Sequence, residues 1–193
     1  MDTVPFRRGF TLIELLVVIA IISVIAGLLV PTLLTGRRES YKIQCTNNLR
    51  QIGTFAMTYS DKSGTRCFPF AKTKDSRAHE SLNELLALYP GELPPELFKC
   101  QESPETFRAE RAEDGSYVLG EENLSYTWVA RRTKPTVNSP LASYRYVDGF
   151  EDEDGVHAGH NGGMNVLWTD GPVRFMLTEN RDPETMLPPG LTH

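Results

Sequence analysis

The feature of this 193-residue sequence that constrains its fold most is a long apolar run near the N-terminus. From Leu12 to Val30 every residue is apolar except Glu14, Ser23 and Gly27. An α-helix rises about 1.5 Å per residue, so this run would extend about 28 Å, close to the roughly 30 Å of hydrocarbon in a bilayer. We therefore expect a membrane-spanning helix over about 12–30, and the run argues against a purely cytosolic soluble protein.

The rest of the composition narrows the function classes. The formal net charge is −5 at pH 7, opposite to the balance of most nucleic-acid binders, so no nucleic-acid partner is expected. The three cysteines form no C-x-x-C pair, which argues against a zinc ribbon or a thioredoxin-like redox site. The sequence also lacks the signatures of serine hydrolases, nucleotide-binding loops and zinc proteases. It therefore predicts a protein that is not an enzyme.

The charges around the apolar run leave the membrane topology open. Arg7 and Arg8 precede the run, while Arg37, Arg38 and Lys42 follow it. A secretory signal peptide would have a shorter apolar core and a small-x-small cleavage site after it, and no Ala-x-Ala follows here. The run is therefore interpreted as an anchor that stays in the lipid bilayer.

Glu14 is the anomaly within the run. A carboxylate deep in a bilayer costs about 2.5–3.5 kcal/mol on insertion scales, which favours a partner for it. The alternative is that Glu14 lies near the start of the helix, where the helix dipole favours an acid and water can reach it. Spacing alone does not separate these two interpretations.

The segment from Arg7 to Ala20, RRGFTLIELLVVIA, closely resembles the class III signal of type IV pilins and type II secretion pseudopilins. The resemblance implies that residues 1–9 are a leader peptide, which a prepilin peptidase cleaves after Gly9 on the cytoplasmic side. It implies that Phe10 then becomes an N-methylated N-terminus. It also implies a single-pass protein of the inner membrane, with a cytoplasmic N-terminus and a periplasmic head.

The same resemblance implies roles in assembly for Glu14 and Pro31. Glu14 would be the fifth mature residue, and in the family this glutamate is thought to neutralise the new α-amine of a neighbouring subunit. Apolar contacts in lipid discriminate poorly between helix registers, whereas a charge pair that is costly unless matched sets one register. Pro31 lacks a backbone N–H and should kink or loosen the helix where such filaments extend on assembly. The alternative is a helix that ends at the membrane surface.

Beyond Pro31 the apolar residues keep a helical spacing, which predicts one long helix over residues 10–62. Polar residues, among them Lys42 and Asn48, are expected on the other faces of this helix. Serine and glycine accumulate at 61–64 and are expected to end it. The expected core stripe comprises Ile43, Cys45, Leu49, Ile52, Phe55, Ala56 and Tyr59.

Residues 63–193 are expected to form a globular α+β head with a small antiparallel sheet and a loop-rich middle over 92–120. The clearest signal is a hairpin around Asp170-Gly171, a favoured tight turn between two strands whose apolar residues alternate. Each hairpin strand should therefore bury one face. With the long helix, this is a pilin-like architecture. The predicted elements of the head are a helix over 79–89 and strands over 125–130, 143–148, 164–169 and 172–177.

His160, separated by nine residues from Asp170-Gly171, resembles the tail signature of a prepilin-associated family named for this spacing. The stretches CTNNLRQIG at 45–53 and FKC at 98–100 resemble the same family. A His160–Asp170 dyad is not expected, because the intervening strand would separate the two by roughly 20 Å. The expected roles are structural, with His160 at the start of the hairpin and Asp170 accepting turn N–H groups.

The cysteines are candidates for a disulfide, because an extracytoplasmic head would permit one. Cys45–Cys100 is the expected pair, since it would tie the long helix to the loop-rich middle. Closing that loop is worth about 4 kcal/mol in the chain-entropy model. Pairing of Cys67 with either cysteine is the main alternative, and an unpaired structural thiol is also open.

A cluster of acidic residues and histidines precedes the hairpin. Its carboxylates would suit a hard cation such as calcium, but the spacing of a calcium-binding loop is absent. An acidic, solvated loop is the default interpretation of such a run, so no cofactor is expected unless calcium binds here. The candidate ligands are Asp148, Glu151, Asp152, Asp154, His157 and His160.

Together these features predict a pseudopilin-like structural subunit. The prepilin peptidase would trim it, and it would join other pilin-like subunits at an inner-membrane secretion assembly platform, in a short periplasmic filament for protein export. One alternative is a minor pilin or adhesin of a type IV pilus. The other is a membrane-anchored metal-dependent enzyme that uses His157 or His160.

Overall fold

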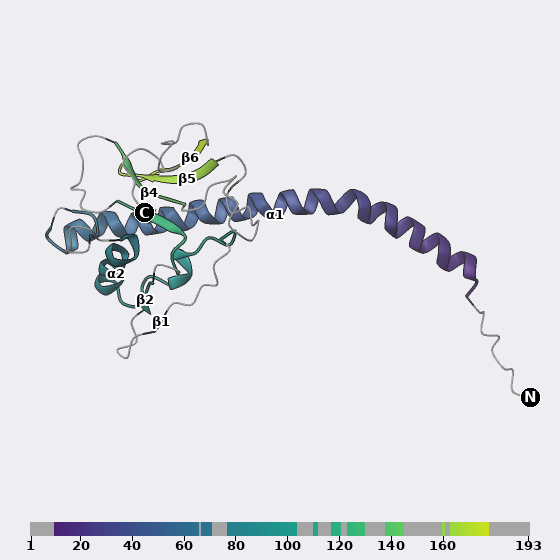
Figure 1. Cartoon of the computed structure of the whole chain (residues 1–193), viewed down its shortest axis with the longest axis horizontal. Coiled ribbons are helices and arrows are strands. Elements are labelled where there is room, and N and C mark those ends of the chain that lie inside the picture. Colours follow the sequence, from purple (N-terminus) through teal and green to yellow (C-terminus); the bar gives the residue numbers. More distant parts are fainter. Residues whose placement is uncertain are drawn as a thin grey trace, which may run out of the picture. The chain divides into compact units, whose positions relative to one another are not determined.

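The computed structural model describes residues 10–65, 67–70, 77–103, 110–111, 117–120, 123–129, 138–144, 160 and 163–177. The chain divides into two compact units, Met1–Arg38 and Glu39–His193. Helix α1 (Leu12–Lys62) runs through both units, and every strand of the described residues belongs to the second (Figure 1). The expected combination of a long N-terminal helix with a small antiparallel sheet is confirmed, and the fold is α+β.

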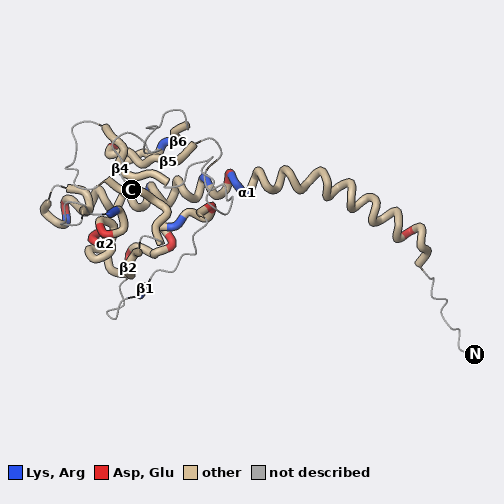
Figure 2. The backbone as a smooth tube through the Cα atoms, viewed as in Figure 1, with Lys and Arg blue, Asp and Glu red and all other residues tan. Residues whose placement is uncertain are grey.

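The first part of α1 exposes apolar side chains on all of its faces. Its most apolar 18-residue window has a mean hydropathy of 3.0, and no residue of that window is buried. Between Glu14 and Arg37 this part of the helix carries no charged residue (Figure 2). Such a surface is costly to keep in water. Among the described residues, α1 is the one helix long and apolar enough to cross a membrane.

Pro31 lies inside α1, and the helix continues past it. Proline has no N–H to donate to the carbonyl of Gly27, so the helix lacks one backbone hydrogen bond here. Two hydroxyls bond to carbonyls near this point: Thr32 Oγ1 donates to Leu29 O over 2.7 Å, and Thr35 Oγ1 donates to Pro31 O over 3.1 Å. The alternative of a helix that ends at the membrane surface would have α1 stop near Pro31, and it is wrong because α1 continues to Lys62.

The second part of α1 buries one stripe of side chains, and two expectations about this stripe are wrong. Ile43 is 55% exposed, because it lies two positions before Cys45 and therefore about 200° away around the helix. Asn48, expected on a polar face, is buried because it lies on the stripe between Cys45 and Ile52. Its amide nitrogen donates to Lys99 O over 3.0 Å. The buried residues of α1 are Cys45, Asn48, Leu49, Ile52, Gly53, Ala56, Tyr59 and Ser60.

Helix α2 (Ala78–Leu88) forms within one residue of the predicted range. It begins where Arg77 N donates to Glu80 Oε2 over 3.0 Å, which satisfies a backbone donor at the helix start. Tyr89, directly after α2, contacts α1. Its ring centroid lies 5.0 Å from that of Phe55, and its hydroxyl lies 2.8 Å from Thr58 Oγ1.

The main sheet has four antiparallel strands in the order β3-β4-β5-β6. The strands are β3 (Tyr126–Trp128), β4 (Pro140–Tyr144), β5 (Gly163–Trp168) and β6 (Val173–Leu177). Strand β4 begins before the predicted 143–148, and residues 145–148 lie outside the described part of the chain. The region expected to be loop-rich holds a 3-10 helix, η1 (Pro95–Phe98), and a strand pair, β1 (Glu110–Arg111) and β2 (Tyr117–Val118).

The predicted hairpin is confirmed as β5 and β6, which pair from Gly163↔Leu177 to Leu167↔Val173. Gly171 in the turn has φ +102°, a conformation that favours glycine, and its N–H donates to Trp168 O over 2.9 Å. The Asp-Gly pair therefore predicted the turn correctly, because it reflects a local backbone requirement.

Strand β5 differs from the expectation that it buries one face only. All four residues from Met164 to Leu167 are buried, although their side chains alternate between the two faces. Helix α1 covers the face that carries Asn165, whose amide nitrogen donates to Lys42 O over 3.0 Å. On the same face, a Cβ at Gly53 of α1 would lie 2.7 Å from Leu167 Cδ1, so helix and strand are in close contact.

Gly163 at the start of β5 is predicted to be intolerant of a side chain. A Cβ there would overlap the backbone oxygen of Met176 and lie 2.8 Å from Phe175 Cζ. Gly163→Ala should therefore destabilise the head by about 1–3 kcal/mol, the usual cost of overpacking. Denaturant unfolding of the full chain in detergent, followed by tryptophan fluorescence, measures this.

Gly36→Ala is the matched control, because a Cβ at Gly36 meets no atom within 4 Å. It should leave the unfolding midpoint of the head unchanged. An equal midpoint for Gly163→Ala and the wild type would contradict the packing described for β5 and β6.

Candidate functional site: a buried cluster of two thiols and an imidazole

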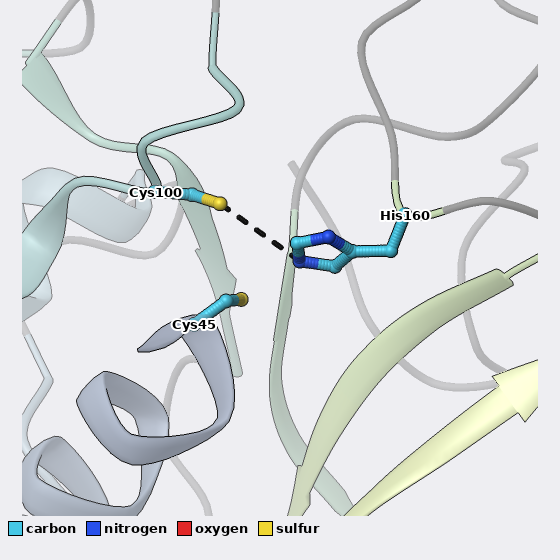
Figure 3. Close-up of side chains that lie close together, drawn as sticks. All are labelled: Cys45, Cys100 and His160. Atoms are coloured by element: carbon cyan, nitrogen blue, oxygen red, sulfur yellow. Dashed lines mark hydrogen bonds between the residues drawn. The ribbon is translucent and has the colours of Figure 1, made fainter. Parts of the chain in front are cut away.

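Two cysteines and a histidine meet in the interior of the second unit. Cys45 comes from α1, Cys100 follows η1, and His160 precedes β5 (Figure 3). Their sulfur and nitrogen atoms all lie within 4.8 Å of one another, and each residue is only 1% exposed. Segments 55 and 60 residues apart in sequence thus bring three soft or borderline ligand atoms to one point.

Backbone contacts explain why each side chain arrives there. Cys45 lies on the buried stripe of α1. The chain before Cys100 is held by two bonds, from Asn48 Nδ2 to Lys99 O and from Ser125 N to Phe98 O over 3.0 Å. The carbonyl of His160 accepts a hydrogen bond from Gly163 N over 2.8 Å, which fixes His160 at the start of the hairpin as its sequence position predicts.

The His160 ring is oriented on three sides. Its Nδ1 lies 2.6 Å from Glu102 Oε2, so the ring N–H donates to the carboxylate. Its Nε2 lies 3.8 Å from Cys100 Sγ. The Tyr144 ring stacks on it, with centroids 4.8 Å apart and an interplanar angle of 28°. An imidazole held this way presents Nε2 to the thiols in a fixed direction.

The electrostatics separate the two thiols. The hydrogen bond from Cys45, followed by that with His160, outweighs burial and lowers the pKa of Cys100 to about 5. Burial and the neighbouring Cys100 raise the pKa of Cys45 well above its usual value. Burial alone would lower the pKa of His160, but Cys100 and Glu102 outweigh it and the net pKa is raised. These shifts favour the Cys100 thiolate and the His160 imidazolium as the charged forms in this cluster.

The cluster is closed to large substrates, because all three side chains are almost fully buried. Two buried tyrosines, Tyr126 and Tyr144, border the thiols, and burial raises the pKa of both hydroxyls. Buried thiols of this kind are usually structural rather than reactive. The arrangement can instead hold a cross-link, either between the sulfurs or through a metal.

Cys45 and Cys100, the predicted disulfide pair, lie close together, but no bond joins their sulfurs. Both cysteines are free thiols in the structure, as is the half-buried Cys67. The two sulfurs lie within 4.8 Å of each other. The pairing therefore stays a prediction, and the sequence pattern did find the two residues that meet.

Asp170 and Gly171 lie in the hairpin turn, apart from the cluster. Asp170 Oδ2 accepts hydrogen bonds from the side chains of Asn138, over 2.8 Å, and Arg174, over 2.9 Å. These side-chain donors take the place of the expected turn N–H groups. His160 and Asp170 therefore have different partners, in line with the expectation that they form no dyad.

Most of the predicted acidic metal site lies outside the described residues. This holds for Asp148, Glu151, Asp152, Asp154 and His157, and also for Gly9 of the predicted cleavage site. His160 is the described member of that predicted calcium site, and its neighbours are sulfurs and one carboxylate. Sequence reasoning missed Glu102, because nothing but its place two residues after Cys100 connects it with His160.

At the start of α1, Glu14 has a local partner that the sequence also encodes. Glu14 Oε2 accepts from Thr11 N over 2.9 Å and from Thr11 Oγ1 over 2.6 Å. Thr11 followed three residues later by Glu14 is the pattern of a capping box. The exposed Phe10 directly precedes this cap. The carboxylate of Glu14 is therefore satisfied at the helix start, close to the backbone of residue 10.

The described residues form a long apolar N-terminal helix and a head with a small antiparallel sheet, which is the α+β arrangement expected from the resemblance to type IV pilins. A family model of the prokaryotic N-terminal methylation motif matches residues 5–30. A segment of 52 residues, 27% of this chain, is 44% identical to the type IV wide pilus major component PilA4 of Thermus thermophilus. The match spans 40% of that protein. No solved structure matches the chain significantly.

The raised pKa of His160 makes a pH-dependent prediction. Removing the carboxylate charge in Glu102→Gln should lower the pKa of His160, because that charge stabilises the imidazolium. A histidine whose pKa is higher in the folded than in the unfolded chain stabilises the fold below about pH 6.5. This stabilisation is lost as the pH rises through the pKa of the folded state. The variant should therefore lose more stability at pH 5.5 than at pH 9. NMR titration of the histidine ring in reduced, chelator-treated protein measures the pKa.

Glu96→Gln serves as the control, since Glu96 is exposed in η1. It should leave the titration of His160 unchanged. If the pKa of His160 is the same in Glu102→Gln as in the wild type, the contact between the two side chains is not present in solution.

Proposed function

We propose that this chain is a pseudopilin, a structural subunit that a prepilin peptidase trims after Gly9 and that assembles into a periplasmic filament of the type II secretion kind. The observation that carries the proposal is the methylation motif over residues 5–30, continuous with an exposed apolar helix. Trimming would leave Phe10 as an N-methylated N-terminus. The head would lie in the periplasm, with α1 anchored in the inner membrane.

The exposed surface of α1 supports assembly with other pilin-like subunits. Its apolar side chains need lipid before assembly, and the same side chains can pack against identical helices afterwards. Apolar packing in lipid gives little preference for one register between neighbouring helices, so a pair of polar groups determines the register better. Glu14 is the one acidic residue of the run, and cleavage would create an α-amine four residues before it. A cross-subunit pair of these two charges would fix the stagger between neighbours.

Pro31 supports the same assembly role. The missing hydrogen bond to Gly27 makes this point the weakest of the apolar helix. Extension of the filament would stretch the helix here at lower cost than elsewhere. The hydroxyls of Thr32 and Thr35 already bond to carbonyls nearby and would keep some of them satisfied.

A type IV pilus subunit is the second candidate function. The 44% identity to a pilus major component over 52 residues favours it. The two candidates share processing and assembly and differ in what the filament does. Deletion of the gene should abolish export of proteins across the outer membrane and leave surface pili intact if the chain is a pseudopilin. Loss of surface filaments with normal export would favour the pilus subunit instead.

Variants of the helix start separate the charge of Glu14 from its cap. Glu14→Gln keeps an oxygen that accepts from Thr11 but removes the charge. Breaking a buried charge pair by removing one partner costs about 3–5 kcal/mol. We therefore expect Glu14→Gln to reach the membrane and be trimmed normally, but to enter filaments at least about tenfold less. Membrane flotation and immunoblots of sheared filaments measure the two steps.

Two controls sharpen this experiment. Thr11→Ala removes the hydroxyl that donates to Glu14 but keeps the charge of Glu14. Ser23→Ala removes another polar side chain of the run, whose hydroxyl bonds to Ile19 O within the same helix. Both should enter filaments at close to the wild-type level. Normal incorporation of Glu14→Gln, or an equal loss in Thr11→Ala, would contradict the pairing of charges between subunits.

A further inference from the structure

We propose that Cys45, Cys100 and His160 bind one Zn²⁺ ion in the interior of the head, through Cys45 Sγ, Cys100 Sγ and His160 Nε2. The ion would act as a cross-link between α1, the segment after η1 and the start of β5. This inference does not depend on the proposed function, because it concerns how the head is held together.

The distances between the donor atoms suit the ion. Tetrahedral zinc holds sulfur at about 2.3 Å and imidazole nitrogen at about 2.0–2.1 Å, which places neighbouring donors about 3.5–3.8 Å apart. Cys100 Sγ and His160 Nε2 already lie 3.8 Å apart, and all three donors fall within 4.8 Å of one another. The side chains therefore need to move by less than about 1 Å to close around zinc.

The carboxylate of Glu102 completes the arrangement on the far side of the ring. Zinc-binding histidines usually donate their second N–H to a carboxylate or carbonyl, which fixes the tautomer and turns the other nitrogen to the metal. Glu102 Oε2 lies 2.6 Å from Nδ1, and this leaves Nε2 facing the sulfurs. Stacking on Tyr144 holds the ring plane. A Cys45–Cys100 disulfide would involve neither His160 nor Glu102, whereas a zinc ion would use both.

The chemistry of the donors selects the metal class. Two thiolates and an imidazole are soft or borderline ligands that suit zinc, whereas calcium needs six to eight oxygen ligands. Two thiolates together with the Glu102 carboxylate would leave three negative charges in a buried place, and a divalent cation offsets two of them. Three protein donors leave one position of the tetrahedron for a fourth ligand.

Zinc would contribute to the stability of a small head. Its ligands come from segments 55 and 60 residues apart, and they are not preformed in the unfolded chain. The free energy of metal binding then becomes free energy of folding. Zinc coordination would also protect both thiols from oxidation.

The first test uses the full chain, purified from membranes in detergent without added metal or reductant. Mass spectrometry of the metals should find about one zinc per chain, and denaturation with a chelator should release three reactive thiols, one for each cysteine. A single reactive thiol without zinc would show that two of the three cysteines form a disulfide and would overturn the proposal. Three thiols that take up no zinc from added zinc chloride would overturn it as well.

Replacement of the metal by cobalt tests the ligands without any mutation. Cobalt(II) in the wild-type chain should show the visible bands of a tetrahedral site and the near-ultraviolet absorption of thiolate ligands. A spectrum without thiolate absorption would overturn the proposal, even if the chain binds metal elsewhere.

Variants test each named residue. Glu102→Gln keeps all three ligands and should weaken zinc affinity about 10- to 100-fold in a chelator competition, as loss of such a partner typically does. Cys100→Ser should lower the zinc content well below one ion per chain. Cys67→Ser is the matched control, since Cys67 is the cysteine outside the cluster, and it should keep one zinc. Loss of zinc in Cys67→Ser, or unchanged affinity in Glu102→Gln, would contradict the assignment.

Discussion

One unbroken helix has to suit two environments, and the rest of the structure depends on this constraint. Helix α1 runs from Leu12 to Lys62 and changes character along its length. Its first part exposes apolar side chains that water does not favour, and its second part supplies a narrow buried stripe. A helix with this surface is stable in lipid or against similar helices. The methylation motif over residues 5–30 lies where such a helix would be trimmed and paired.

The head is attached to the second part of α1 by polar contacts as well as by apolar packing. Asn48 reaches Lys99 O and Asn165 reaches Lys42 O, so the segment before Cys100 and strand β5 each gain a directional bond to the helix. Along α1, Cys45 of the buried cluster lies between Lys42 and Asn48, the two helix residues of these contacts. Apolar burial alone specifies position loosely, whereas these bonds fix the register of each segment on the helix.

What the sequence predicted correctly depends on local signals. The helices α1 and α2 and the hairpin follow from periodicity and from Asp170-Gly171, and each signal lies within a few residues. The bond between His160 and Glu102 could not be predicted, since 58 residues separate the two and neither position has a pattern of its own. The burial of Asn48 was missed because its polarity suggested solvent, although its spacing placed it on the stripe. The cap of Glu14 by Thr11 was readable from the sequence as a T-x-x-E pattern and was overlooked.

The central claim is that the apolar helix belongs to a subunit that is trimmed and then polymerises. Mass spectrometry of the N-terminus, on protein isolated from the membranes and filaments of its native cell, tests this claim most directly. The account predicts a chain that starts at Phe10 and carries one N-methyl group. An uncut chain starting at Met1, found alone in the membrane fraction, would contradict it.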